Sequence, residues 1–94
     1  MQDDHALVDL YQALLSLENE QQARNFIKDL CTPQEIASLQ ERWRVCQMLD
    51  KGTMSYRQIH ARIGASLTTI GRVARFLKDE PHHGYRQVLN HFKK

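Results

Sequence analysis

Apolar residues recur at helical spacing along most of this chain, most clearly between Ser55 and Leu77. A first short run of this kind stops at Gly64 and a second begins directly after it, so a turn separates two helices. Ser55 and Ser66 stand where N-caps are needed, and Gly64 stands where a left-handed backbone conformation favours glycine. This pattern predicts a helix–turn–helix. The contacts between its two helices are expected from Ile59, Ile63, Ala65, Ile70 and Val73.

The second helix of the pair has an apolar and a polar face. Its inward face is expected to consist of Leu67, Ile70, Val73, Ala74 and Leu77. Its outward face then consists of Thr68, Thr69, Gly71, Arg72 and Arg75. Threonine methyl groups suit the thymine methyl in the major groove, and arginine suits guanine or phosphate. The outward face favours DNA binding, although a solvated face in a purely structural bundle has the same composition.

Four more helices are predicted by the same periodicity, over residues 5–18, 20–30, 33–51 and 85–92. Asp3 or Asp4 is expected to cap the first of them, after a frayed start to the chain. Thr32 and Glu35 form a capping box, and Gly52 is expected to end the third helix. No stretch alternates as a β-strand does, so the predicted fold class is all-α with about six helices.

The chain has 94 residues, which allow one domain with a limited core. One face of each of the first two helices is apolar, and the remaining chain offers little to cover both, which favours dimerisation. No signal peptide or run of transmembrane length is present, so a soluble, cytoplasmic protein is expected. Cys31 and Cys46 form no CxxC pair and are interpreted as reduced thiols.

Charge is distributed unevenly between the two halves of the chain. Residues 1–50 carry four basic and nine acidic side chains, a net charge of −5. Residues 51–94 carry nine basic and two acidic side chains, a net charge of +7. The basic half contains the predicted helix–turn–helix, and a positive surface attracts the phosphate backbone of DNA.

Other candidate chemistry is weaker. No catalytic triad, paired carboxylates or glycine-rich phosphate loop stands out, so neither enzyme activity nor a cofactor is expected. His82, His83 and His91 lack the fixed spacing of metal ligands and are interpreted as surface residues, so no metal site is predicted. Trp43 lies at core spacing in the third helix and is interpreted as a core residue rather than a stacking platform.

The order of these features resembles the tryptophan repressor family. The matching run covers residues 30–78 without gaps, about half of the chain. Its motifs are Thr32-Pro33-x-Glu35, Leu39, Arg42-x-Arg44, Gly52-x-Met54-Ser55-x-Arg57, Gly64-Ala65, Thr69-Ile70-x-Arg72 and Leu77-Lys78. The tail Gly84-Tyr85-Arg86-x-Val88-Leu89 looks more like the YerC/YecD-type branch of that family than the tryptophan repressor itself.

The resemblance implies an intertwined homodimer, in which helices of two chains share one core and two helix–turn–helix heads project outward. Each head would dock on one half-site of a near-palindromic operator. A single domain is expected over residues 1–94, with dimerisation helices in 1–52, the helix–turn–helix in 53–78, and a C-terminal turn and helix in 79–94.

The resemblance also implies which residues contact DNA. Carried over position by position, they are Tyr56, Arg57, His60, Leu67, Thr68, Thr69, Gly71 and Arg72. Arg57 and Thr69 match the family pattern, and a different operator is expected because the tryptophan repressor differs at Tyr56, His60, Leu67, Thr68 and Gly71. Phosphate contacts are expected from Arg57, Arg62, Lys78 or Lys51, and base reading from Thr68, Thr69 and Arg72.

The effector pocket of the family is altered in this sequence. Its positions correspond here to Thr32, Arg42, Arg72, Val73 and Phe76. The tryptophan repressor holds L-tryptophan between the two arginines, but Val73 replaces a glycine and Phe76 replaces a serine. Two large apolar groups would fill the indole space and leave the ammonium group of the ligand without a partner, so L-tryptophan binding is not expected. Arg42 either lines this pocket or pairs with a carboxylate such as that of Glu35 or Glu41.

Two functions are compatible with these features. The first is a dimeric, sequence-specific regulator of transcription that binds double-stranded DNA, most simply a repressor that occludes a promoter without needing L-tryptophan. The second is a helical protein–protein adaptor that keeps the fold without specific DNA binding. The positive charge of residues 51–94 and the outward threonines and arginines favour the first.

Overall fold

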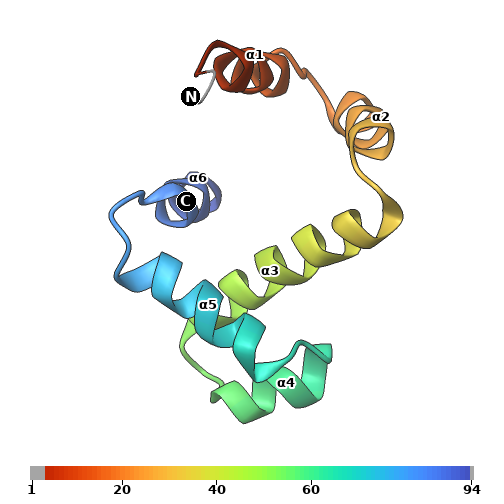
Figure 1. The fold of residues 1–94 in the computed structure, drawn as a ribbon. Coiled ribbons are helices and arrows are strands. Elements are labelled where there is room, and N and C mark those ends of the chain that lie inside the picture. Colours follow the sequence, from red (N-terminus) through yellow and green to blue (C-terminus); the bar gives the residue numbers. More distant parts are fainter. Residues whose placement is uncertain (1–3, 94) are drawn as a thin grey trace. The chain divides into compact units, whose positions relative to one another are not determined.

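The computed structural model describes residues 4–93, which form six α-helices joined by turns and loops (Figure 1). They are α1 (Asp4–Leu15), α2 (Glu20–Leu30), α3 (Pro33–Lys51), α4 (Tyr56–Ile63), α5 (Leu67–Lys78) and α6 (Gly84–Phe92). No strand occurs among these residues, which confirms the predicted all-α fold class. The chain divides after Ile36 into two compact units, which are described separately.

The first unit contains α1, α2 and the first turn of α3. Asn19 caps α2, since its side chain accepts a hydrogen bond of 2.9 Å from the N–H of Gln22. No described residue of α1 or α2 is buried, and large apolar side chains remain exposed, from Leu7 at 39% to Leu15 at 84%. The predicted apolar faces of these two helices are therefore present but uncovered within this unit.

Helix α1 is shorter than the sequence predicts. It ends at Leu15 rather than near residue 18, because the N–H of Ser16 also bonds to the carbonyl of Ala13 at 3.2 Å and the Ser16 hydroxyl donates to the same carbonyl at 2.7 Å. Such bonds to the third residue back tighten the last turn and end the helix. The frayed start and the expected cap Asp3 lie outside the described residues, and Asp4 is the first residue of α1 itself.

Helix α3 begins and ends as predicted. The Thr32 hydroxyl accepts from the N–H of Glu35 at 3.1 Å, and the Glu35 carboxylate accepts from the N–H of Thr32 at 2.8 Å, which completes the capping box. Gly52 follows the helix at a φ of +71°, a conformation that residues with a Cβ rarely adopt. Burial in α3 is confined to its C-terminal half, at Val45, Cys46 and Leu49.

The second unit encloses a small apolar core. Its buried residues are Val45, Cys46, Leu49, Ile59, Ala65, Ile70, Val73, Ala74, Leu77 and Leu89. Helix α5 packs against both α4 and α6, so it lies at the centre of this unit (Figure 1). Burial raises the pKa of the Cys46 thiol to about 11, which makes it an inert core residue rather than a nucleophile.

Two ion pairs attach α6 to the end of α3. Asp50, whose side chain is 12% exposed, accepts hydrogen bonds from Lys93 at 2.9 Å and from Arg86 at 2.7 Å. These hydrogen bonds hold the pKa of Asp50 below its ordinary value, although partial burial opposes the shift. The contacts fix the position of α6 relative to α3 and α5.

Candidate nucleic-acid interface

The predicted helix–turn–helix is formed by α4, a turn over residues 64–66, and α5. The Ser55 hydroxyl accepts from the N–H of Gln58 at 3.2 Å, and the Gln58 side chain accepts from the N–H of Ser55 at 2.8 Å. This capping box satisfies two N–H groups that the start of α4 would otherwise leave free. Gly64 ends α4 at a φ of +88°, and its N–H donates to the His60 carbonyl at 2.8 Å. Local hydrogen bonds thus fix both ends of α4.

Ser66 caps α5 and binds Thr69 twice. The Ser66 hydroxyl oxygen accepts from the N–H of Thr69 at 3.1 Å, and the hydroxyl donates to Oγ1 of Thr69 at 3.0 Å. Since Oγ1 of Thr69 acts here as the acceptor, its own proton remains available for one further partner. The cap therefore orients the hydroxyl of a residue that is predicted to read bases.

The inward face of the pair is buried as predicted, with two departures: Ile63 is half-buried and Leu67 is exposed. Ile59 and Ile70 are 0% exposed and Val73 is 1% exposed, whereas Leu67 is 50% exposed. Leu67 is the first residue of α5, where no preceding turn of the helix covers its side chain. Its predicted place in the inward stripe is therefore wrong, and it belongs to the outward side of the pair.

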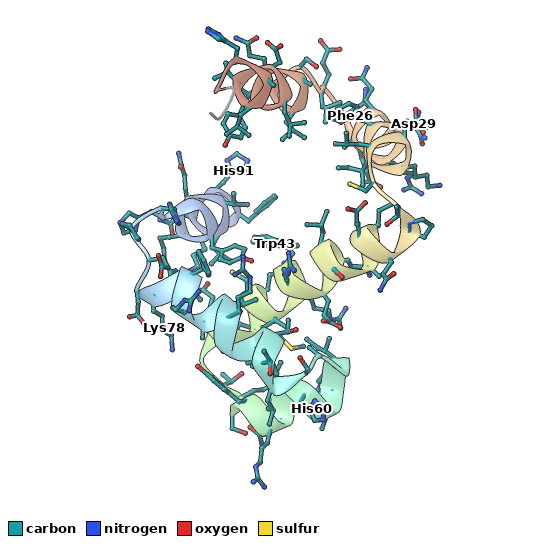
Figure 2. All side chains as sticks on the ribbon, viewed as in Figure 1. Phe26, Asp29, Trp43, His60, Lys78 and His91 are labelled. Atoms are coloured by element: carbon teal, nitrogen blue, oxygen red, sulfur yellow. The ribbon has the colours of Figure 1, made fainter. Side chains whose placement is uncertain are left out.

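The ring of His60 on α4 forms a hydrogen bond with the turn that follows the helix. Its Nδ1 lies 2.6 Å from the carbonyl oxygen of Ala65, which can only accept a hydrogen bond, so Nδ1 carries the proton and donates. Ala65 is fully buried, and this bond gives its carbonyl group a partner. His60 lies on α4 at the exposed side of the pair (Figure 2). Nothing in the sequence indicates the cross-turn bond, because it depends on how the two helices meet.

The outward side of the pair is exposed and basic. Exposed residues predicted to contact DNA are Tyr56, Arg57, His60, Arg62, Leu67, Thr68 and Arg72, whereas Thr69 and Gly71 are half-buried. Within residues 4–93, the cations that engage in no ion pair include Arg57, Arg62, Lys51 and Lys78. Their charges remain available to phosphate groups.

A groove of about 480 Å³ lies between α5, α6 and Trp43 of α3. Its lining consists of Trp43, Arg72, Val73, Phe76, His82, Gly84, Tyr85 and Val88. Three predicted effector-pocket residues, Arg72, Val73 and Phe76, therefore share one groove. Trp43 is half-buried, so it packs on the core as predicted and also forms a wall of this groove.

Of the other two predicted pocket residues, only Arg42 belongs to the unit that contains this groove. Arg42 is not a lining residue, but its charge acts on Tyr85: burial raises the pKa of Tyr85, while Arg42 and Arg72 oppose the shift. Arg42 forms no ion pair within residues 37–93, so the alternative pairing with Glu41 is absent. Thr32 belongs to the first compact unit.

Two histidines outside the helix–turn–helix, His82 and His91, contact aromatic rings. The His82 ring is stacked with the Phe76 ring at a centroid distance of 5.9 Å, and the His91 ring meets the Phe92 ring edge-on at 5.1 Å. Among residues 4–93, no group of three or more His, Cys, Asp or Glu side chains is placed to hold a metal ion. In the same range, no helix has the length and apolar character needed to cross a membrane.

Comparison with known proteins decides the family. The family model described as Trp repressor protein matches residues 5–93. The chain belongs to the Trp repressor family. It is also similar to the uncharacterized protein YerC of Bacillus subtilis, with 38% identity over 84 residues that cover 89% of this chain and 79% of that protein. The resemblance to the YerC branch is thereby confirmed.

Solved structures of Trp repressor relatives have the same fold. A TrpR-like protein from Eubacterium eligens is 39% identical, with a TM-score of 0.86 over 93% of this chain and 88% of its own. A Trp repressor candidate from Staphylococcus aureus is also 39% identical, with a TM-score of 0.85 over 93% and 85% of the two chains. Membership of the Trp repressor family supports, in general terms, a DNA-binding regulator rather than an enzyme.

Proposed function

We propose that this member of the Trp repressor family is a sequence-specific regulator of transcription, a repressor that binds double-stranded DNA in the cytoplasm. The observation that carries the proposal is the exposed N-terminal end of α5, where Thr68 faces outward and the cap orients Thr69. The turn before it is closed by the bond from His60 to Ala65. A rigid helix start of this kind can present base-reading groups to the major groove in a fixed geometry.

Base reading and phosphate binding are assigned to different residues. Thr68, Thr69 and Arg72 on α5 read bases, because threonine and arginine offer the methyl and donor groups that base edges require. The unpaired cations around them bind phosphates: Arg57, Arg62, Lys51 and Lys78. Tyr56, His60, Leu67 and Gly71 complete the surface against DNA.

The regulator acts as an intertwined homodimer on a near-palindromic operator. Support comes from the apolar face of α1, where Leu7, Val8, Tyr11 and Leu14 are between 39% and 51% exposed. A second copy of the chain would cover such a face, and two heads would then read two half-sites. In this proposal residues 1–52 supply the dimerisation helices, 53–78 the DNA-binding head, and 79–94 the turn and helix that complete it.

DNA binding is proposed to be independent of L-tryptophan and of any cofactor. Val73 is 1% exposed and belongs to the core, so its side chain fills the space that a glycine at this position would leave. The centroid of the Phe76 ring lies 4.4 Å from the Arg72 guanidinium carbon, so a planar ligand would have to compete with this ring for the guanidinium.

Selection of binding sites from a random pool of duplexes, with and without L-tryptophan, tests the proposal. We expect the same near-palindrome to be enriched in both arms at near-physiological salt. Enrichment only with L-tryptophan would contradict the independence from an effector. No enrichment in either arm would contradict specific DNA binding and favour a protein–protein adaptor.

Two variants test the division between base reading and phosphate binding. Thr69→Ala should weaken binding to the selected site by about 1–3 kcal/mol and leave random DNA nearly unaffected. Arg62→Ala should weaken both duplexes alike and make the dependence of affinity on salt less steep. Fluorescence anisotropy over a salt series measures both effects, and equal losses on both duplexes for both variants would refute the assignment.

A further inference from the structure

Phe76 is the centre of a side-chain cluster that joins α5 to the turn before α6. The guanidinium carbons of Arg72 and Arg75 lie 4.4 Å and 5.0 Å from its ring centroid. The ring of His82 in the turn is stacked with it, with an interplanar angle of 11°. Arg75 also pairs with Glu80 of the same turn at 3.5 Å. One ring of α5 thus contacts two cations of its own helix and an aromatic residue beyond its end.

The cluster restricts the side chain of Arg72. An exposed arginine loses much rotamer freedom when it binds a base or a phosphate, and this loss weakens binding. A cation–π contact orders the guanidinium before DNA arrives. Arg72 forms no ion pair among residues 4–93, so the Phe76 ring is the contact that orients its charge.

The apolar core does not need the Phe76 ring. Val73, Ala74 and Leu77 of the same helix are at most 7% exposed and fill the interior, whereas Phe76 is half-buried in the wall of the groove. Its aromatic face, rather than its volume, therefore distinguishes its contacts from those of a core side chain. A role limited to packing would be met equally well by leucine.

We propose that Phe76 is a positioning residue for DNA binding: its ring holds Arg72 and the C-terminal end of α5 in one arrangement without an added small molecule. This inference rests on the proposed function and names the side chain that makes it independent of an effector. The Phe76 ring covers one face of the Arg72 guanidinium, and both side chains line the groove. The C-terminal end of α5 is marked by the N–H groups of Asp79 and Glu80, which donate to the Arg75 carbonyl at 2.8 Å and 3.0 Å.

Two variants, Phe76→Tyr and Phe76→Leu, are compared with the unsubstituted protein. They separate the contribution of the aromatic face from that of the apolar volume. We expect Phe76→Leu to bind the selected operator about 5- to 10-fold more weakly, and Phe76→Tyr to remain within about twofold of the parent. The amides of Asp79 and Glu80 should exchange faster in the leucine variant only. Gln87→Ala, at an exposed position on α6, is the matched control and should change neither quantity.

The outcomes distinguish this inference from the proposed function. If the parent binds the operator and the leucine and tyrosine variants match in affinity and exchange, the inference is wrong while the proposed function stands. If the parent selects no DNA, the proposed function is wrong, and the two exchange rates still decide whether the Phe76 ring holds the end of α5. Faster exchange in both variants would likewise overturn a role for the aromatic face.

Discussion

The two compact units of this chain differ in how far their apolar side chains are buried. In residues 37–93, parts of four helices enclose ten buried side chains. In residues 4–36, the described residues of α1 and α2 are all at least partly exposed, although both helices have clear apolar faces. Helical periodicity indicates that one face of a helix packs against other apolar groups, but it does not show which groups these are. The second unit forms a core within a single chain, although Val88 and Phe92 of α6 stay 46% and 71% exposed. For the apolar faces of the first unit we propose a second copy.

Ile70→Ala should have the largest effect on this contrast, because Ile70 is fully buried in the second unit. The cavity left by the side chain should lower the free energy of unfolding by about 2–5 kcal/mol. Urea denaturation followed by circular dichroism measures the change. Leu67→Ala on the same helix is the control: Leu67 is 50% exposed, so its loss should stay below about 1 kcal/mol. Equal losses would mean that the core of this unit lies elsewhere.

Leu14→Asn tests whether a second copy of the chain covers α1 in the first unit. Leu14 is 41% exposed in the single chain, so a monomer should tolerate asparagine, but a dimer that covers α1 would lose two buried leucines. We expect the dissociation constant of the dimer to rise roughly 100-fold. Analytical ultracentrifugation over a concentration series measures it, with Gln12→Ala on the same helix as the control. An unchanged constant would remove α1 from the interface.

Interactions that lie within one helix or turn can be predicted from the sequence. Ser55, Ser66 and Gly64 act as predicted because caps and left-handed turns are formed by residues three or four positions apart. The predicted end of α1 is wrong because short-range bonds of Ser16 compete with continuation of the helix. The predicted burial of Leu67 is wrong because periodicity does not show which turns of a helix a neighbour covers.

In the candidate site, the contacts that the sequence does not predict all join separate elements. The His60 bond to Ala65 and the stacking of His82 with Phe76 depend on the path of the backbone through two turns. Trp43 forms a wall of the groove because α3 passes beside α5 and α6, which no spacing along the chain indicates. The resemblance placed Arg72 and Phe76 in one pocket, but the contact between their side chains became visible only in three dimensions.

Asp50→Asn and Glu20→Gln together test how much an ion pair in each unit stabilises the fold. Asp50 is 12% exposed and binds Arg86 and Lys93, whereas the Glu20–Arg24 pair of α2 has side chains 86% and 53% exposed. We expect Asp50→Asn to lower the free energy of unfolding by about 1–2 kcal/mol at neutral pH. The control Glu20→Gln should stay within about 0.5 kcal/mol, because water screens an exposed pair.

The pH dependence of the Asp50 contribution has a definite sign. Because the folded state lowers the pKa of Asp50, its stabilisation is fully present above the ordinary aspartate value and is lost as the pH falls through the folded value. The difference in stability between the parent and Asp50→Asn should therefore shrink as the pH is lowered below about 4. Urea denaturation at a series of pH values measures it. A difference that persists in acid would mean that Asp50 acts through shape rather than charge.

His60→Ala should have the smallest effect, yet it separates two explanations of a rigid head. The substitution removes the donor to the Ala65 carbonyl, and the loss of one partly buried hydrogen bond lowers the free energy of unfolding by about 1 kcal/mol. His60→Asn is the matched variant, because its amide N–H can donate from nearly the position of Nδ1. If asparagine restores both stability and operator affinity, the bond across the turn is what orients α5 for DNA. If it restores stability alone, the imidazole ring itself contacts DNA and the rigidity of the turn comes from its caps.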